Sequence, residues 1–151
     1  MQKPDDWQLR LIQLLSVFGM FIAYFLLLFH NGSLVGVCEP SGWDDCGQVS
    51  GPGAPYSSIG PIPVALLGLL GYIAMFVAVW LKDWVNLLEE YIPEIMIGLT
   101  GLALLFSAYL TALELFVIHA ICRYCVISAV IVLVQFILAV GYLRGANQAS
   151  E

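Results

Sequence analysis

Two of the four cysteines in this chain form a CxxC motif, a spacing that suits thiol–disulfide chemistry. Cys122 and Cys125 lie three positions apart, and on a helix this spacing places both sulfurs on one face, close enough to form a disulfide. Arg123 lies between them, and both its charge and a helix N-terminus favour the thiolate, which is the reactive species. The motif is therefore interpreted as a redox-active pair, and the alternative is two inert buried cysteines.

The other two cysteines, Cys38 and Cys46, are eight positions apart in a polar segment rich in glycine and proline. A disulfide between them would either staple this loop, by limiting its unfolded conformations, or exchange electrons with the CxxC pair. A four-thiolate zinc site is a weaker alternative, because such sites usually show two CxxC-like knuckles. An even number of cysteines in close pairs also favours an oxidising compartment.

The elements that position these cysteines are expected to be membrane-spanning helices. Of the 151 residues, 61% are hydrophobic and only five are Lys or Arg, a balance that excludes a soluble globular domain of this size. Uncharged apolar runs of about 27 Å or more as helices are long enough to cross a bilayer. We expect an all-α integral membrane protein that forms a single domain over residues 1–151, in which four transmembrane helices form a bundle. The predicted spans are 11–29, 63–81, 94–118 and 123–143. A long extracytoplasmic redox loop is predicted over 30–62.

Basic residues predict the orientation of the bundle. Four spans place both termini and the connector between spans two and three on one side, which carries Lys3, Arg10, Lys82 and Arg144, whereas the other side carries only Arg123. Basic residues concentrate on the cytoplasmic side of membrane proteins, so the termini are expected to be cytoplasmic. Both cysteine pairs would then meet on the periplasmic or extracytoplasmic face of an inner or cell membrane.

Two further ionisable residues lie near the CxxC motif. Glu114 falls inside the third predicted span, and an ionisable residue there is a functional candidate. Its place near the end of that span also allows the carboxylate to reach the headgroups, which would give it no role. His119 lies in the turn before Cys122, where a proton carrier and a solvated loop histidine are both possible, the second being favoured.

The combined pattern resembles the vitamin K epoxide reductase family, most closely its prokaryotic branch. The resemblance covers about residues 9 to 143. It rests first on the CxxC that opens the fourth span and on the spaced pair Cys38 and Cys46 in the first outer loop. It also rests on a serine pair that precedes the run Gly-Pro-Ile-Pro-Val-Ala-Leu-Leu-Gly over 60–68, a pattern that extends to Tyr72. Each part is unspecific alone, but the combination is specific.

This resemblance implies a membrane thiol oxidase built around a quinone, either ubiquinone or menaquinone. Electrons from a thioredoxin-like periplasmic thiol oxidant protein would enter at Cys38 or Cys46 and pass to Cys122. They would leave from Cys125, the cysteine expected to face the quinone. The residues expected at the quinone are Cys125, Ser57, Ser58, Ala129 and Glu114.

The sequence departs from the family pattern at two positions and leaves two other functions open. Animal members carry an Asn early in the second span and a Tyr four residues after the CxxC, where this chain has Val64 and Ala129. These departures put activity on an epoxide in doubt. A quinone or vitamin K epoxide reductase proper is therefore kept as an alternative and not as the main prediction. A non-catalytic tetraspan scaffold with a stapled loop is another.

Many bacterial members also append a thioredoxin-like domain; with the chain ending at Glu151, we expect that partner to be a separate protein.

Overall fold

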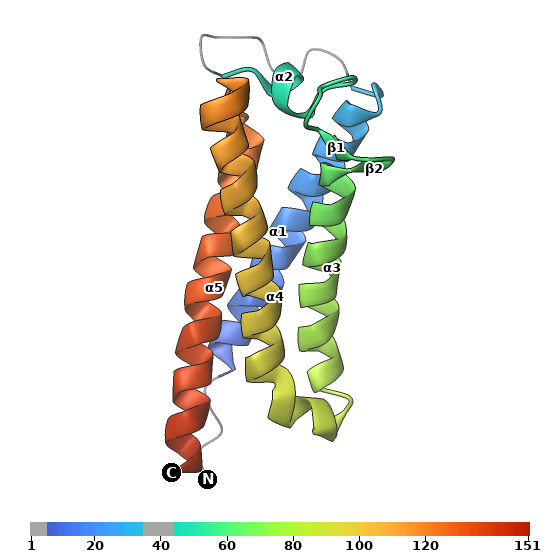
Figure 1. The fold of residues 1–151 in the computed structure, drawn as a ribbon. Coiled ribbons are helices and arrows are strands. Elements are labelled where there is room, and N and C mark those ends of the chain that lie inside the picture. The colour runs from blue at the N-terminus through green and yellow to red at the C-terminus, as the bar shows by residue number, and fades with distance from the viewer. Residues whose placement is uncertain (1–5, 35–43) are drawn as a thin grey trace.

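The structure is a computed structural model that describes residues 6–34 and 44–151, and it is dominated by long helices (Figure 1). The long elements are α1 (Trp7–His30), α3 (Val64–Lys82), α4 (Asn86–Leu113), which continues into the π-helix η1 (Glu114–Ile118), and α5 (Arg123–Ser150). Between α1 and α3 lie the short helix α2 (Cys46–Ser50) and an antiparallel pair of two-residue strands, β1 (Ser58–Ile59) and β2 (Ile62–Pro63). The predicted all-α four-helix fold is confirmed.

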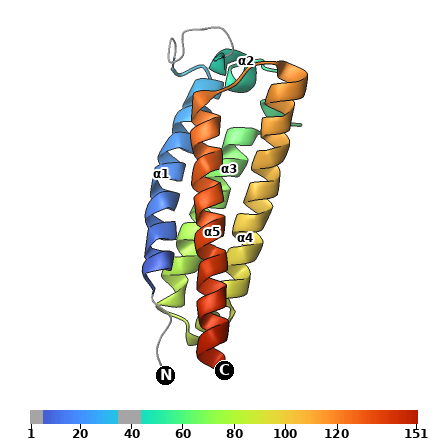
Figure 2. The same ribbon diagram turned by 90° about the vertical axis from the view of Figure 1, so that its left-hand side faces the viewer.

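The long helices form an antiparallel bundle in which each one has two neighbours. Helix α1 packs against α3 and α5, and α4 packs against the same two helices. Figures 1 and 2 show both ends of the chain at one end of the bundle, while α2, the strands and the start of α5 gather at the other. Cys46, Cys122 and Cys125 are thus carried at the end opposite to the termini.

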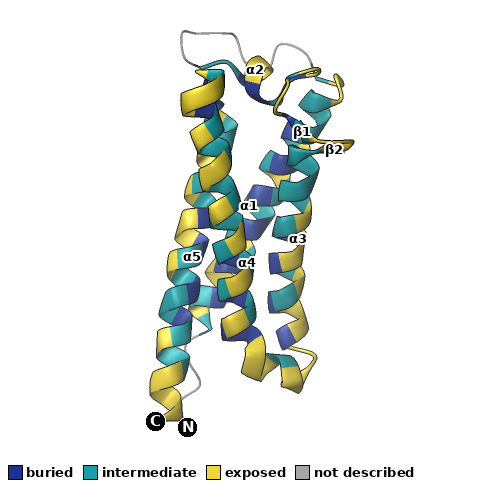
Figure 3. Cartoon of the chain, in the orientation of Figure 1, coloured by how far each residue is buried: buried dark blue, intermediate teal, exposed yellow. Residues whose placement is uncertain are grey.

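The outer faces of the helices are apolar, as a lipid environment requires. All four are long and apolar enough to cross a membrane. Large hydrophobic side chains point outward along their length, for example Phe21 at 69% exposed, Leu105 at 72% and Phe116 at 77%. Figure 3 shows exposed residues on the outside of every long helix and buried ones along the inner contacts. The protein is therefore a multi-pass membrane protein, since water would make such a surface very costly.

Inside the bundle, small and polar residues bring the helices together. An atom added as Cβ at Gly19 would lie 2.3 Å from the ring of Tyr72, so only glycine allows α1 and α3 to approach so closely there. Gln135 of α5 donates from Nε2 to the Ser16 hydroxyl at 2.9 Å and to the Ile12 carbonyl at 3.2 Å, both on α1. These contacts fix the register between neighbouring helices.

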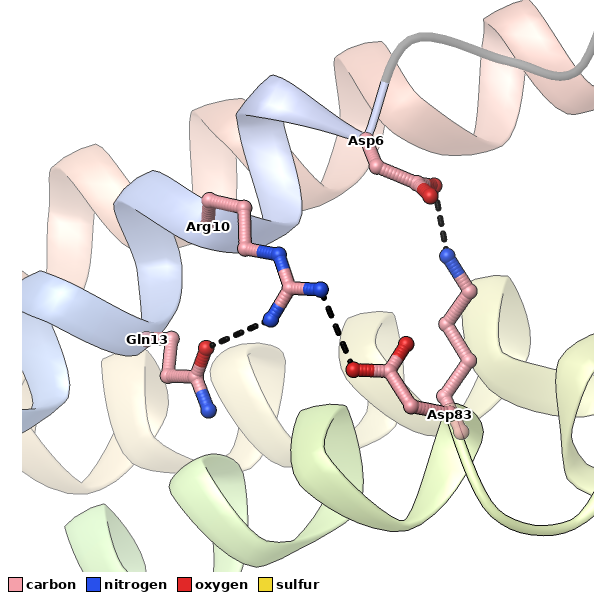
Figure 4. A network of polar contacts seen from close by, with 5 residues as sticks. Asp6, Arg10, Gln13 and Asp83 are labelled. Atoms are coloured by element: carbon pink, nitrogen blue, oxygen red, sulfur yellow. Dashed lines mark hydrogen bonds and ion pairs between the residues drawn. The ribbon is translucent and has the colours of Figure 1, made fainter.

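Ion pairs close the end of the bundle where the chain termini lie (Figure 4). Arg10 donates to the carboxylate of Asp83 at 3.0 Å and to Gln13 at 3.3 Å. Lys82, which is buried, pairs with Asp6. Two of the basic residues on which the predicted orientation depends, Arg10 and Lys82, are thus paired with acids at the end of another helix.

The connector between the second and third spans is shorter than expected from the sequence. The predicted connector ended at Pro93, but α4 already begins at Asn86 and includes this proline. A proline inside a membrane helix is tolerated when neighbouring helices satisfy the freed carbonyl or local geometry adjusts, and Pro93 is buried against the bundle. Helices α1 and α5 also extend beyond the predicted spans, whereas α3 is displaced from its predicted span by one residue.

Candidate active site

The CxxC motif lies at the N-terminus of α5, although not as two residues of one helix. Cys122 is the N-cap residue, with an extended backbone at φ −97° and ψ 117°, and Cys125 lies in the first turn. Among the described residues both are free thiols, and Cys122 is fully buried. The two side chains still meet, because the Cys125 thiol hydrogen-bonds the Cys122 sulfur. The two sulfurs are thus brought together by the extended residue at the start of the helix. The three-residue spacing within a helix, which the sequence suggested, is not the cause.

This hydrogen bond favours the thiolate of Cys122. The bond from Cys125 is the main cause that lowers the pKa of Cys122, and backbone donors at Tyr124 and Cys125 act in the same direction. Burial and the nearby Glu114 carboxyl oppose it. Cys122 is therefore present as the reactive thiolate at lower pH than an ordinary cysteine.

Arg123 has a partner that the sequence did not predict. Its guanidinium forms an ion pair with Asp44 of the redox loop, with Nε donating at 2.8 Å, and its charge also interacts with the Cys122 thiolate. Charge alone could not reveal this, because the partner lies far away in sequence. The arginine therefore joins the loop to the CxxC motif.

Backbone contacts reinforce this connection and place α2 over the motif. The Asp45 N–H donates to the Ile121 carbonyl at 3.1 Å, next to a parallel bridge between Asp44 and Ile121. The Asp45 carboxylate then caps α2 by accepting from the N–H groups of Gly47 at 3.0 Å and Gln48 at 3.3 Å. The start of α2, which is Cys46, is thereby fixed beside the turn that carries Cys122.

The loop cysteine and the motif share one buried cluster. Cys46 is 1% exposed and disulfide-bonded, and it belongs to the same apolar cluster as Cys122. Cys38, the other predicted loop cysteine, lies outside the described residues. At the far end of α2, the Ser50 hydroxyl lies 3.7 Å from the Cys125 sulfur. One short helix therefore contacts both cysteines of the motif.

A mostly apolar cavity of about 390 Å³ borders Cys125. It lies among α1, α3, α4 and α5, with Val49 and Ser50 of α2 also lining it, and its volume falls within the range of small-molecule sites, about 300–1,000 Å³. Four of the five residues expected at the quinone line it, namely Ser57, Glu114, Cys125 and Ala129. Ser58 does not; it lies in β1, where the alternation of the strand directs neighbouring side chains to opposite faces.

Several polar residues of this cavity were missed by the sequence reading. His30 and Thr111 line it, and so do Tyr72 and Ser128, whose hydroxyls lie 2.7 Å apart. The His30 Nδ1 atom is buried without a hydrogen-bond partner among the described residues. The available signal was weak, since a single polar residue in an apolar run does not reveal which face it occupies. Together they offer the few polar groups that orient a ligand in an apolar site.

Glu114 lies inside the bundle and not on its outer surface. It is only 4% exposed, and its carboxylate accepts from the Cys122 N–H at 3.3 Å. His119, in contrast, is exposed and follows η1 in a left-handed conformation with φ 56°. This agrees with the favoured interpretation of His119 as a solvated turn residue.

Comparison with known proteins points to one family. A family model described as "Vitamin K epoxide reductase family" matches residues 10–140, which is most of the chain. A search of curated proteins finds no match. For a zinc site, no group of three or more metal-binding side chains occurs within the described ranges.

Proposed function

The chain belongs to the vitamin K epoxide reductase family, whose members are membrane oxidoreductases that use quinones or vitamin K, and we propose that it is a quinone-dependent thiol oxidase that generates disulfides. The observation that carries this proposal is the position of Cys125, which contacts Cys122 on one side and lines the apolar cavity on the other. A dithiol between a docked loop cysteine and a ligand-sized cavity can pass electrons from one to the other.

The proposed reaction begins outside the membrane. A reduced thioredoxin-like protein attacks the disulfide that contains Cys46, forms a mixed disulfide, and leaves oxidised, so that the loop pair becomes a dithiol. A loop thiolate then attacks the Cys122–Cys125 disulfide at Cys122, and Cys125 leaves as the reduced thiol. The second loop sulfur closes the loop disulfide and releases Cys122 as its thiolate.

The cavity fits a quinone in size and in the character of its lining. A quinone supplies a two-electron, two-proton acceptor in this site. The chain contributes an apolar wall that excludes water, a few polar groups from α1 and α4 that can hydrogen-bond carbonyl oxygens, and Cys125 at the edge of the cavity. The hydrogen bond from Cys125 lowers the pKa of Cys122 and so favours the thiolate that closes the Cys122–Cys125 disulfide as the electrons leave.

Two cavity positions favour thiol oxidation over epoxide reduction. Val64 and Ala129 occupy the positions where animal members carry an Asn and a Tyr, and both line the cavity as apolar residues. The hydrogen bonds that those polar side chains would make are not available from these two positions. The acceptor in this chain is therefore proposed to be a quinone, ubiquinone or menaquinone, and not an epoxide.

We place the active end on the extracytoplasmic side. The basic residues Arg10 and Lys82 lie at the opposite end of the bundle, where they form ion pairs (Figure 4), and the positive-inside rule assigns that end to the cytoplasm. A membrane-impermeant thiol reagent should label the reduced loop cysteines in intact cells. Labelling that requires lysis would reverse this orientation.

The proposed function is tested with the purified protein in lipid nanodiscs. Mixed with a reduced thioredoxin-like protein and a soluble quinone, it should consume two thiols for each quinol formed. The C122S/C125S variant should be inactive, while S150A, which alters an exposed serine at the far end of α5, serves as the control. Full activity of the double variant, or no quinol formation by the unaltered protein, would exclude the proposal.

A further inference from the structure

A buried carboxyl lies at the junction of the dithiol and the cavity without a cationic partner. Glu114 is 4% exposed, lines the cavity, and forms no ion pair with any described Lys or Arg. Buried carboxylates are normally paired, because transfer of an isolated charge out of water is costly. An unpaired one at a reacting centre needs another explanation.

Two contacts of the Glu114 side chain hold its carboxyl beside the reacting atoms, and its backbone carbonyl makes a third contact. Its Oε2 accepts from the Cys122 N–H at 3.3 Å, and its side chain also hydrogen-bonds the Cys125 thiol. The Glu114 carbonyl accepts from the Ala120 N–H at 3.2 Å, across the π-helical turn that it begins. Both the side-chain carboxyl and the backbone carbonyl of Glu114 are thus held by the short segment that leads to Cys122 and by the CxxC motif.

The Cys125 thiol has one proton and lies beside two groups that can accept it, the Cys122 sulfur and the Glu114 carboxyl. It hydrogen-bonds the Cys122 sulfur and also the Glu114 carboxyl. Closing the Cys122–Cys125 disulfide requires this proton to leave, and Cys122 cannot keep it while its own sulfur forms the new bond. The Ser50 hydroxyl also lies 3.7 Å from the Cys125 sulfur and lines the cavity, but an alcohol is too weak a base to take up this proton. Glu114 is the carboxyl that contacts Cys125 and lines the cavity among the described residues.

On the basis of the proposed function, we infer that Glu114 is a catalytic residue that carries the proton of Cys125 to the quinone in the cavity. The Cys122 thiolate and the Cys125 thiol form one S–S bond and give up two electrons, and the proton of Cys125 passes to Glu114 and then to a quinone oxygen. One further proton comes from the aqueous face, so that two electrons and two protons yield the quinol. Glu114 ends in the ionised form in which it began.

The first test measures one turnover of pre-reduced protein, so that neither the loop nor a protein partner takes part. Glu114→Gln keeps an oxygen that can accept from the Cys122 N–H but cannot take up a proton. Quinol formation should fall by about 10² or more at neutral pH, the usual contribution of a general acid–base group. The rate should recover as pH rises, because solvent then removes the Cys125 proton. Glu94→Gln, an exposed carboxyl of α4, should behave as the unaltered protein.

The second test needs no quinone. In the C122S background, alkylation of Cys125 is followed as a function of pH, with and without Glu114→Gln. An ionised Glu114 beside Cys125 disfavours the thiolate, so its removal should move the alkylation profile to lower pH. The other ionisable groups that line the cavity, His30, Tyr56 and Tyr72, are unchanged in this comparison. An unmoved profile would show that Glu114 is not the ionised neighbour that the relay requires, and would overturn the inference.

A third measurement separates proton transfer from a structural role. In Glu114→Ala, small carboxylic acids added to the buffer should restore quinol formation, and the restored rate should increase with the base strength of the acid. Restoration that is independent of base strength, or a Glu114→Gln rate within threefold of the unaltered protein, contradicts the relay. If the unaltered pre-reduced protein forms no quinol at all, the proposed function itself fails, whereas the alkylation profile still tests Glu114.

Discussion

The guanidinium of Arg123, between the two cysteines of the motif, forms an ion pair with the carboxylate of Asp44, 79 residues earlier in the chain. This pair, with the adjacent backbone bridge at Ile121, connects the redox loop to the start of α5. Cys46 follows Asp44 by two residues, so the pair acts directly on the distance between the loop disulfide and Cys122. The loop is therefore docked by charge as well as by apolar contact.

Breaking this pair should slow electron transfer from the loop without affecting the CxxC itself. Arg123 is 57% exposed, so solvent screens the interaction and an effect of up to about fivefold is expected for Asp44→Asn in thiol oxidation with the protein partner. Reduction of Cys122 and Cys125 by dithiothreitol, a small dithiol that reaches them directly, should keep its rate. The charge-swapped double variant D44R/R123D should recover part of the loss, and Arg144→Gln, an exposed arginine at the other end, is the matched control. Equal losses with both reductants would show that the pair supports the CxxC turn instead.

The loop cysteines are predicted to be a relay and not a staple. Cys46→Ser should abolish oxidation of the protein partner, because the loop can no longer accept its electrons, yet dithiothreitol should still drive part of the quinone reduction through Cys122. Thiol consumption with the two reductants measures this split. A staple would give the reverse result, with a normal rate toward the protein partner and only a lower melting temperature.

The thiolate of Cys122 should depend on the hydrogen bond from Cys125. The pKa of Cys122 is lowered chiefly by that bond, so the thiolate is present at lower pH than for an ordinary cysteine. Cys125→Ala removes the donor and should shift the titration of Cys122, followed by the ultraviolet absorbance of the thiolate, to higher pH. Cys125→Ser retains a hydroxyl donor and should shift it less. Identical titrations of the two variants would assign the lowered pKa to the backbone donors at the helix start.

A side chain placed in the cavity should block the quinone. Gly68 lines the cavity, and an atom added as its Cβ meets nothing within 4 Å, so Gly68→Leu should fold and fill part of the space. We expect the KM for a soluble quinone to rise at least tenfold while a single turnover of thiol exchange with the protein partner is retained. Gly98→Leu, on the exposed face of α4 and equally free of neighbours, is the control. An unchanged KM would place the quinone elsewhere.

The close contact between α1 and α3 should be the most sensitive packing site. Gly19→Ala places a methyl group against the Tyr72 ring, whose nearest atom is 2.3 Å from the ideal Cβ position, so the ring or a helix must move. A cost of about 1–3 kcal/mol is expected in the free energy of unfolding, as for other overpacked sites. Thermal unfolding in detergent, with Gly98→Ala as reference, measures it. Equal stability of the two variants would mean that the helices separate at little cost.

The amino-acid sequence by itself determined the long helices and the end of the bundle at which Cys46 and the CxxC motif lie. Length and apolarity are sufficient for a membrane helix, because the bilayer removes every other way of satisfying the backbone. Four spans then bring Cys46 and Cys122 to one end, and the pattern of cysteines and the Gly-Pro run carried the resemblance to the family that the match over residues 10–140 shows.

Tertiary structure alone decided which side chains surround the dithiol. The partner of Arg123, the contact of Glu114 with Cys125, and the polar groups of the cavity all join residues from segments that are far apart in the sequence or on different helices. Helical periodicity is a weak guide here, since a membrane helix is apolar all round and its pattern does not mark the inner face. The π-helix at Glu114 also shifts that face by changing the turn just before the CxxC. The chemistry of this site therefore depends on rotations and docking contacts that a linear pattern does not contain.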